Sequence, residues 1–317
     1  MDNFINISNL NSLSEIVNEA KKLKTDPFKF KQLGKNKTLG MLFFNPSLRT
    51  RLSTQKAAIN LGMDVMVMNF TSDGWAIEFE DGSVMNTSTS EHIKEAAQVI
   101  SQYCDVIAIR SFAKLKDRKL DYEDKVIQGF LKYANVPVIN MESATAHPLQ
   151  ALADAITINE LKKVSKPKVV LTWVPHPKAL PQAVANSFVE IMTFQDVNFI
   201  VTHPAGFELK PEITKNATLE YNQDKAFENA DFIYAKNWSS YINYGKISQD
   251  ETWRITTSKM KLTNNAKFMH CLPVRRNVVV DDAVLDSDNS IVIEQANNRT
   301  CAAQIVLKKI LENYEKK

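Results

Sequence analysis

The residues Ser47-Leu48-Arg49-Thr50-Arg51 combine hydroxyl and guanidinium groups directly after the apolar run Thr38 to Phe44. A strand is therefore predicted to end, and a helix to begin, where these groups gather. Backbone N–H groups without partners at a helix start attract anions, and an arginine can hold two phosphate oxygens at once. The segment predicts a phosphate site, although a serine cap beside solvated arginines explains it equally well when it is taken alone.

Two further polar residues stand at the ends of predicted strands. Arg110 ends the run Asp105 to Ser111, at the edge where ligands of open α/β sheets bind. His147 lies in Ala146-His147-Pro148-Leu149-Gln150, at a strand-to-helix junction where Pro148 suits the first helical turn. Each has a simpler reading by itself, as a surface charge for Arg110 and as a helix cap for His147.

The third segment, His270-Cys271-Leu272-Pro273, follows another apolar run. A cysteine in this position is more often a small core residue than a nucleophile, so covalent catalysis by Cys271 is not favoured. Residues before a proline avoid the helical conformation, so Leu272 is expected at a turn. Such a turn can present carbonyl oxygens to an NH₂ group of a ligand.

Apolar runs typical of strands alternate with amphipathic, helix-like stretches along almost the whole chain, which predicts α/β layers with parallel sheets. The predicted strands are 38–44, 64–70, 105–111, 136–141, 168–174, 198–203, 231–236, 267–272 and 290–294. The main predicted helices are 10–23, 48–61, 91–103, 148–163 and 299–314. We expect two α/β domains, residues 1–146 and 147–298, with a C-terminal helix, 299–317, that packs back on the first domain.

Composition narrows the classes of function. The 39 basic and 36 acidic residues are scattered along the chain, so nucleic acid is not an expected partner. The N-terminus lacks the features of a signal peptide and no apolar run approaches about 18 residues, so a cytoplasmic protein without membrane contact is expected. The chain has only 8 glycines, no glycine-rich nucleotide motif and 3 widely spaced cysteines. Neither a nucleotide cofactor nor a zinc cluster is expected.

In residue type, order and separation, the three segments resemble the active-site signatures of the carbamoyltransferases, over essentially the full chain. The resemblance implies two α/β domains flanking a cleft, carbamoyl transfer from carbamoyl phosphate to an amine without metal or organic cofactor, and a homotrimer with shared sites. It implies that carbamoyl phosphate is bound by Ser47, Leu48, Arg49, Thr50, Trp75 of a neighbouring subunit, Arg110, His147, Gln150, Cys271, Leu272 and Arg299. Of these, Arg49, Arg110, His147 and Gln150 are the implied catalytic residues.

The second substrate is indicated by Tyr234-Ala235-Lys236-Asn237-Trp238, which stands where ornithine carbamoyltransferases carry an acidic motif for the free α-amino group. A lysine there repels an ammonium group and favours a carboxylate or an acylated nitrogen. With the segments 141–145, 173–177 and 272–277, this one resembles the N-acylornithine carbamoyltransferases. That resemblance implies a knotted second domain and acylornithine contacts from Glu142, His176 and Lys236, with Arg275 or Arg276 as a further carboxylate partner. As single residues, the two arginines could be surface charges and Glu142 a helix cap.

The acyl group depends on a position just before the helix predicted at Glu91. Acetyl-specific members tend to carry glutamate there and succinyl-specific members proline, whereas the matching residue here is Ser90. Serine lacks the charge that would repel a succinyl carboxylate, so N-succinylornithine is the favoured substrate and N-acetylornithine the alternative. Glu91 could reverse this preference by turning inward.

Two alternatives of other kinds stay open beside this one. A noncatalytic regulator that binds carbamoyl phosphate would keep the same pocket without turnover. Transfer to aspartate or putrescine is disfavoured by Lys236 and by the proline-rich segment Trp173 to Pro181.

Overall fold

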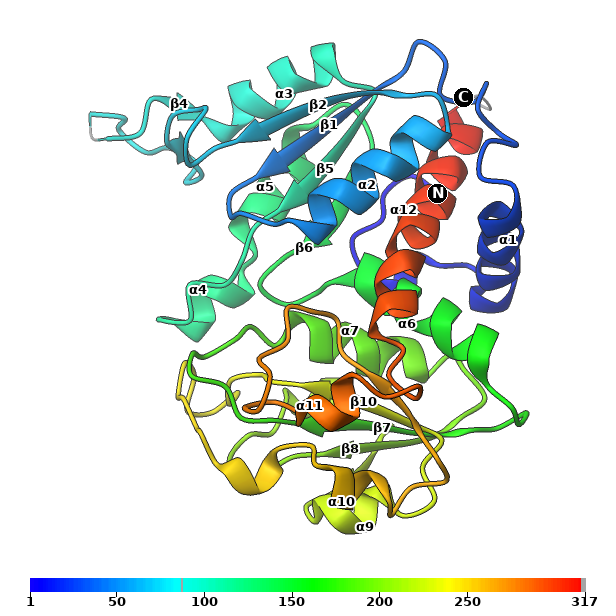
Figure 1. The fold of residues 1–317 in the computed structure, drawn as a ribbon. Helices are drawn as coiled ribbons and strands as arrows, with labels where there is room; N and C mark the ends of the chain where they lie inside the picture. The colour runs from blue at the N-terminus through cyan, green and yellow to red at the C-terminus, as the bar shows by residue number, and fades with distance from the viewer. Residues whose placement is uncertain (87, 315–317) are drawn as a thin grey trace. The chain divides into compact units, whose positions relative to one another are not determined.

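The computed structural model describes residues 1–86 and 88–314 and contains two compact units (Figure 1). Unit 1 comprises Met1–Lys114, Lys119–Leu149 and the chain from Arg299 onward, and unit 2 comprises Leu115–Arg118 and Gln150–Asn298. The unit boundaries fall within the helices α6 (Pro148–Leu161) and α12 (Val292–Tyr314). Among the described helices, none is long and apolar enough to cross a membrane.

Unit 1 is built on a parallel sheet with the strand order β2-β1-β5-β6. Its strands are β1 (Thr38–Phe43), β2 (Asp64–Asn69), β5 (Val106–Arg110) and β6 (Val138–Glu142). The inner strands β1 and β5 are buried almost throughout, as expected of parallel strands that are covered on both faces. The edge strand β2 instead alternates between exposed and half-buried side chains.

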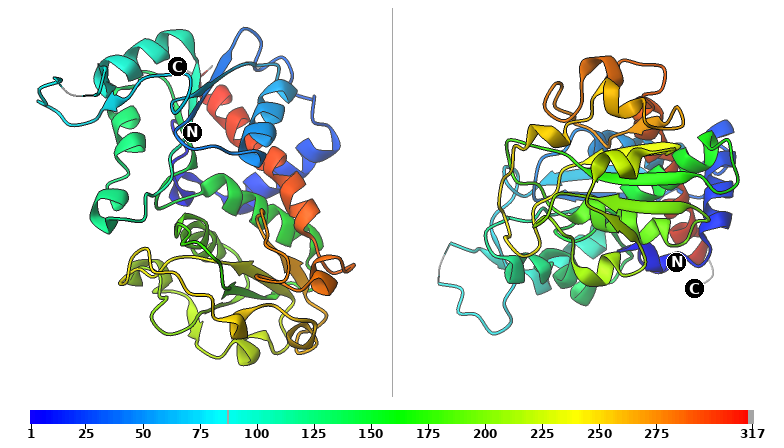
Figure 2. Two further views of the ribbon diagram at one scale, coloured as in Figure 1. Left: turned by 60° about the vertical axis from the view of Figure 1, so that its left-hand side comes forward. Right: turned by 90° about the horizontal axis from the view of Figure 1, so that it is seen from below.

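Unit 1 also contains several helices. They are η1 (Ile7–Asn9), α1 (Leu13–Thr25), α2 (Arg49–Asn60), α3 (Ile93–Tyr103), α4 (Arg118–Tyr122, of which Arg118 belongs to unit 2) and α5 (Lys125–Tyr133). Of these helices, α2, α3 and α5 contact the strands of this sheet. Ile93 of α3 and Phe130 of α5 pack with Ile107 of β5 in one buried cluster. The short parallel strands β3 (Ile77–Glu78) and β4 (Glu91–His92) lie on a segment that projects from the unit (Figures 1 and 2).

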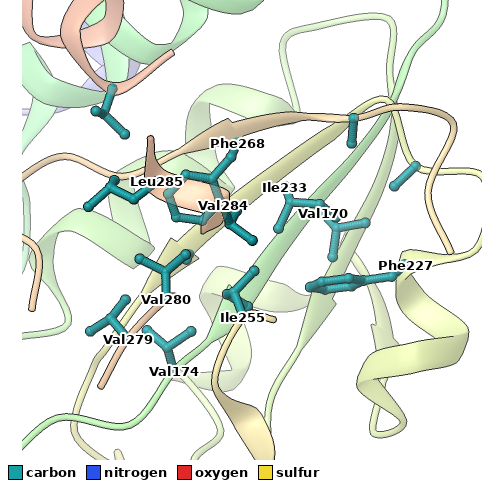
Figure 3. Packing of buried hydrophobic residues seen from close by; sticks show 14 of the residues in the cluster. Val170, Val174, Phe227, Ile233, Ile255, Phe268, Val279, Val280, Val284 and Leu285 are labelled. Carbon is teal, nitrogen blue, oxygen red and sulfur yellow. The ribbon is translucent and has the colours of Figure 1, made fainter. Parts of the chain in front are cut away.

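Unit 2 has a parallel sheet with the order β11-β10-β7-β8-β9. Its strands are β7 (Lys168–Trp173), β8 (Asn198–Thr202), β9 (Thr218–Glu220), β10 (Phe232–Lys236) and β11 (Lys267–Met269). Its helices are α7 (Ala183–Met192), α8 (Pro211–Thr214), α9 (Gln223–Phe227), η2 (Glu251–Trp253), α10 (Thr257–Met260) and α11 (Asp282–Leu285). Figure 3 shows one core, where Val170 and Ile233 of the sheet pack with Phe227, Ile255 and Phe268.

Both sheets reverse their strand order at one point. In unit 1 the chain adds β2 on one side of β1 and then β5 and β6 on the other. In unit 2 it adds β8 and β9 on one side of β7 and then β10 and β11 on the other. Because the connections diverge at such a reversal, the carboxyl ends of the two strands that flank it are the expected ligand site. These are β1 with β5, and β7 with β10.

The predicted α/β class with parallel sheets is confirmed, but one predicted strand is wrong. Residues 290–294 do not form a strand, because α12 begins at Val292 and only an isolated bridge joins Ser290 to Phe268. An apolar run this short cannot be assigned to helix or strand by periodicity. The strand predicted at 267–272 ends at Met269, which leaves the residues that follow in a loop. Several elements were not predicted, among them α4, α5, α7 (Ala183–Met192) and β9.

Candidate active site

The residues predicted to bind phosphate lie at the reversal point of the unit 1 sheet. Phe43, the last residue of β1, is paired with Arg110, the last residue of β5. The chain after β1 leads directly to α2, whose first residue is the half-buried Arg49. Ser47 Oγ accepts the N–H of Thr50 at 3.3 Å, so a hydroxyl satisfies one backbone donor of the first turn. Leu48, at the cap position itself, is exposed.

Thr50 is the centre of a buried polar group that we call the Thr50 cluster, which consists of Thr50, Arg110, Glu142, His147 and Arg299. The Thr50 hydroxyl oxygen accepts hydrogen bonds from Arg110 at 3.3 Å and from Arg299 at 2.6 Å. All five side chains are buried. Two guanidinium groups that converge on one buried hydroxyl repel each other, so an anion bound beside them would offset their charge.

Within the Thr50 cluster, Glu142 contacts both Arg110 and His147. Its carboxylate forms an ion pair with Arg110 and lies 3.3 Å from His147 Nε2. Glu142 ends β6 and His147 immediately precedes α6, so the two residues bracket the loop that joins these elements. The carboxylate therefore offsets one of the two arginine charges and orients the imidazole ring.

Asp124 is a residue of this region that the sequence did not reveal. Its carboxylate accepts hydrogen bonds from Ser143 Oγ at 2.8 Å, from the N–H of Ala144 at 2.8 Å and from Thr145 Oγ1 at 2.5 Å. These contacts hold the loop that carries His147. Burial raises the pKa of Asp124, and the hydrogen bonds oppose that shift. Asp124 lies in a stretch, 112–135, for which no element was predicted, so no sequence signal pointed to it.

Trp75 and Ser90 come together on the projecting segment of unit 1. The Ser90 N–H donates to the carbonyl of Ala76 at 3.0 Å, next to the pairing of β3 with β4. The Trp75 indole N–H donates to the Glu91 carboxylate at 2.8 Å, while the ring itself is 59% exposed. Ser90 is exposed as well. Trp75, predicted to enter the site of a neighbouring subunit, and Ser90, predicted to select the acyl group, are thus neighbours.

The residues predicted to bind the amino acid lie at the reversal point of the unit 2 sheet. Lys236, the last residue of β10, is paired with Trp173, the last residue of β7. His176 lies three residues after Trp173 in the chain. The buried ammonium group of Lys236 donates to the carbonyl of Asn237 at 2.9 Å. Arg275 Nε donates to His176 Nε2 at 3.2 Å. Cationic side chains therefore gather at this sheet edge, which suits a carboxylate ligand.

The Arg275 contact defines the state of His176. Because a guanidinium N–H can only donate, Nε2 is the unprotonated acceptor of this bond. Nδ1 lies 2.8 Å from the carbonyl oxygen of Lys178 and 3.1 Å from its backbone N–H. Burial, and then the charges of Lys236 and Arg275, lower the pKa of His176 against the opposing Lys178 hydrogen bond. The imidazole is therefore neutral near pH 7.

The two neighbouring arginines of unit 2 differ. Arg276 is held on the exposed surface by ion pairs with Asp282 at 2.9 Å and Asp286 at 2.6 Å, whereas Arg275 contacts His176. The remaining predicted residues of unit 2 are Gln150, whose amide donates to Asp154 at 2.8 Å, and the half-buried loop residues Cys271 and Leu272. Across residues 1–86 and 88–314, no group of three or more His, Cys, Asp or Glu side chains could hold a metal ion.

Comparison with known proteins identifies both halves of the chain. Residues 3–160 match the family model described as the carbamoyl-P binding domain of aspartate/ornithine carbamoyltransferases, and residues 181–310 match the Asp/Orn binding domain. An N-succinylornithine carbamoyltransferase of Bacteroides thetaiotaomicron is 52% identical, over 99% of this chain and 100% of that protein. An N-acetylornithine carbamoyltransferase of Xanthomonas axonopodis pv. citri is 39% identical, over 86% of each.

A solved structure adds ligands to this comparison. It is an N-acetyl-L-ornithine transcarbamylase variant, with one glutamate replaced by serine, complexed with carbamyl phosphate and N-succinyl-L-norvaline. It superposes with a TM-score of 0.91 at 36% identity, over 97% of this chain and 99% of that one. Matching family models and full-length relatives leave one conclusion. The chain belongs to the aspartate/ornithine carbamoyltransferase family of enzymes.

Proposed function

We propose that the protein transfers the carbamoyl group of carbamoyl phosphate to the side-chain amine of N-succinyl-L-ornithine, giving N-succinyl-L-citrulline and phosphate. The observation that carries the proposal is the 52% identity, over the full chain, to an N-succinylornithine carbamoyltransferase. Arginine biosynthesis in the cytoplasm is the proposed setting.

The Thr50 cluster is the proposed site of the carbamoyl phosphate. Arg49, Arg110 and the start of α2, with Ser47, Leu48 and Thr50, would hold the phosphate, and His147 and Arg299 would face the carbamoyl oxygen. Glu142, predicted to contact the acylornithine, holds Arg110 and His147. We therefore assign Glu142 a positioning role for the carbamoyl donor.

The transfer itself follows from the charges involved. The neutral amine attacks the carbamoyl carbon, a C–N bond forms, and the carbonyl oxygen becomes an oxyanion. The oxyanion then collapses, the C–O bond to phosphate breaks, and the phosphate leaves with the proton that the amine gives up. Arg110 and His147 are the proposed donors to the growing negative charge, each of a kind worth about 3 kcal/mol when well placed. Gln150, Cys271 and Leu272 are the proposed partners of the carbamoyl NH₂ group.

The amino acid is proposed to bind to unit 2 through its carboxylate. Lys236, Arg275 and the His176 ring lie together at the reversal point of the sheet. Arg276 is already engaged by two aspartates, so we assign the carboxylate contact to Arg275 rather than to Arg276. Free ornithine would bring an ammonium group to this cationic edge, whereas an acylated nitrogen is neutral.

Ser90 is the proposed determinant of the acyl group. A serine variant of an N-acetylornithine transcarbamylase holds N-succinyl-L-norvaline, as expected if removing a carboxylate admits the succinyl carboxylate. In this chain the Glu91 carboxylate accepts the Trp75 indole N–H, which draws its charge toward the tryptophan. N-acetylornithine is the alternative substrate, since members of that branch are 39% identical to this chain.

We further propose a homotrimer in which Trp75 enters the site of a neighbouring subunit. Support comes from the position of Trp75, more than half exposed on a segment that projects from unit 1 (Figure 2). The molar mass in solution, measured by light scattering, tests the trimer directly.

The test of the function is a substrate panel. Carbamoyl phosphate is supplied with ornithine, N-acetylornithine or N-succinylornithine, the citrulline-type product is measured, and Arg49→Ala serves as the blank. We expect turnover of N-succinylornithine only. Ser90→Glu should lower that turnover roughly tenfold by charge repulsion and favour N-acetylornithine. Turnover of free ornithine would contradict the role of Lys236, and binding of carbamoyl phosphate without turnover would favour the noncatalytic regulator.

A further inference from the structure

A buried carboxylate in unit 2 joins two segments that the proposed function uses. Asp154 lies on α6 and is fully buried. Its Oδ1 accepts one hydrogen bond from Gln150 Nε2 at 2.8 Å and a second from Gln295 Nε2 at 2.7 Å. Gln150 lies one turn earlier on α6, and Gln295 lies in the first turn of α12. All three side chains are buried, at 1% exposure or less.

The chemistry of a carboxylate determines how both amides are oriented. An ionised carboxylate can only accept hydrogen bonds, whereas an amide has one end that donates and one that accepts. Gln150 and Gln295 must therefore both turn their NH₂ ends toward Asp154. The group that Gln150 presents on its other side is then its carbonyl oxygen, which is an acceptor. An uncharged partner would lose this preference, because it could pair with either end of an amide.

The second amide carries the same constraint to the loop after β11. Gln295 Oε1, turned away from Asp154, accepts the N–H of His270 at 2.9 Å. His270 Nδ1 in turn accepts the N–H of Leu272 at 2.9 Å. Leu272 has a φ of 55°, in the left-handed region that a leucine rarely adopts. Such a conformation persists where surrounding contacts enforce it, and it is commonest at functional sites.

The surroundings of the carboxylate are buried. Tyr234, fully buried on β10, lies close enough to Asp154 and Cys271 that these side chains, after burial itself, raise its pKa well above the usual range. A phenol that stays protonated is a neutral neighbour of the carboxylate over the whole physiological pH range. Buried networks of this kind strongly favour one arrangement of donors and acceptors.

We propose that Asp154 is a positioning residue that makes the enzyme selective for an NH₂ group on the acyl donor. It directs two acceptors, the Gln150 amide oxygen and the backbone of the Cys271-Leu272 turn, to the place where the two N–H groups of the carbamoyl group would bind. A donor with a methyl group in place of NH₂ could donate a hydrogen bond to neither acceptor, so it would bind more weakly in a buried site. This inference rests on the proposed function, in which Gln150 and the turn contact the carbamoyl group.

The experiment compares two ligands that differ only in this group. Binding of carbamoyl phosphate and of acetyl phosphate to the full-length protein is measured by calorimetry. Asp154→Asn keeps the shape of the side chain and removes the charge. Thr157→Val is the matched control, because Thr157 is equally buried on α6 and accepts an amide from Asn298 of α12 at 2.9 Å. Gln295→Leu is a second test, which removes the hydrogen bonds that link Asp154 to the His270 N–H and leaves the bond to Gln150 in place.

We expect the wild type to bind carbamoyl phosphate roughly tenfold to a hundredfold more tightly than acetyl phosphate. Asp154→Asn should reduce this ratio about tenfold, mainly by weakening carbamoyl phosphate binding, and Gln295→Leu should reduce it by a smaller factor. Thr157→Val should leave the ratio unchanged. Equal weakening of both ligands, or an unchanged ratio in both Asp154→Asn and Gln295→Leu, would overturn the proposal.

The outcome separates this inference from the proposed function. The calorimetric ratio does not depend on turnover, so it tests Asp154 even in a protein that fails the substrate panel. If Asp154→Asn does not fold, the Gln295→Leu ratio decides alone. A wild type that shows no preference between the two phosphates would overturn the inference, while turnover on the panel would still support the proposed function.

Discussion

The two sheet reversal points of this protein are built differently. In unit 1 the Thr50 cluster is buried and already joined by hydrogen bonds and ion pairs between its own members. In unit 2 Lys236 is buried, but His176 is half-buried and Arg275 is exposed. A buried, interlocked site suits a substrate that is the same throughout a family. A more open site, in which single residues contact the ligand, suits the substrate that differs between branches.

The largest effect is expected from breaking the unit 1 site at Arg110. Arg110→Gln removes one of the two guanidinium groups that donate to the Thr50 hydroxyl. It also removes the arginine that forms an ion pair with the buried Glu142 carboxylate. Loss of a charged donor to the phosphate should lower kcat/KM for carbamoyl phosphate roughly a thousandfold. Steady-state kinetics at saturating acylornithine measure this directly. Arg51→Gln is the control, because Arg51 lies on the same first turn of α2 but is exposed.

The structural cost of Arg110→Gln must be measured beside the kinetics. A buried carboxylate left without its partner typically lowers the free energy of unfolding by about 3 kcal/mol. Urea denaturation gives that value, and kinetics on the folded fraction then isolate the effect on catalysis. An Arg110→Gln protein with activity near that of Arg51→Gln would show that the Thr50 cluster is not the phosphate site.

Trp75 ranks next, and it tests whether the unit 1 site is complete within one chain. Trp75→Ala should lower activity roughly a hundredfold if the indole reaches the substrate, while the exposed position predicts an unchanged monomer fold. Mixing Trp75→Ala with Arg110→Gln distinguishes the source of the tryptophan. In a trimer with shared sites, hybrids contain sites with both residues intact, so part of the activity should return. No recovery after mixing would place Trp75 in its own subunit's site, and unchanged turnover would remove it from the site.

A smaller and more selective effect is expected in unit 2. Arg275→Gln should raise the KM for the acylornithine about tenfold and leave the KM for carbamoyl phosphate unchanged, because one charged hydrogen bond to a carboxylate is lost. Arg276→Gln is a matched control one residue away, since its guanidinium is held by Asp282 and Asp286. We expect less than a twofold change for Arg276→Gln. The reverse order of the two effects would exchange the roles of the arginines.

The sequence predicted this architecture well where periodicity and motif agree. The inner strands β1, β5, β7 and β10 are continuous apolar runs, and the polar residues at their carboxyl ends lie at the two reversal points. Which strands are neighbours, however, depends on long-range pairing that no local pattern encodes. Asp124 and Asp154 were missed for the same reason, since their partners become visible only in the folded chain. The strand predicted at 290–294 was wrong because Ile291 to Ile293 are equally compatible with the start of a buried helix.

The smallest effect concerns pH, which acts on the unit 2 site through His176. Its pKa is lowered in the folded protein, chiefly by burial and then by Lys236 and Arg275, whereas the unfolded chain has an ordinary imidazole near about 6.5. Below that pH the unfolded state binds more protons than the folded state. The free energy of unfolding should therefore fall as the pH falls from about 6.5 toward the folded pKa. Above about pH 6.5 this contribution should stay constant.

His203 adds a contribution of the same sign, because burial also lowers its pKa. His176→Asn should remove its own part and leave the part due to His203. Urea denaturation at pH 7.5 and 5.5 measures both, and tryptophan fluorescence reports chiefly on unit 2, which contains the buried Trp173, Trp238 and Trp253. A His176→Asn protein that loses as much stability on acidification as the wild type would mean that His176 is not held neutral by its neighbours. The placement of a neutral His176 beside Lys236 and Arg275, at the edge proposed to bind the carboxylate, would then be wrong.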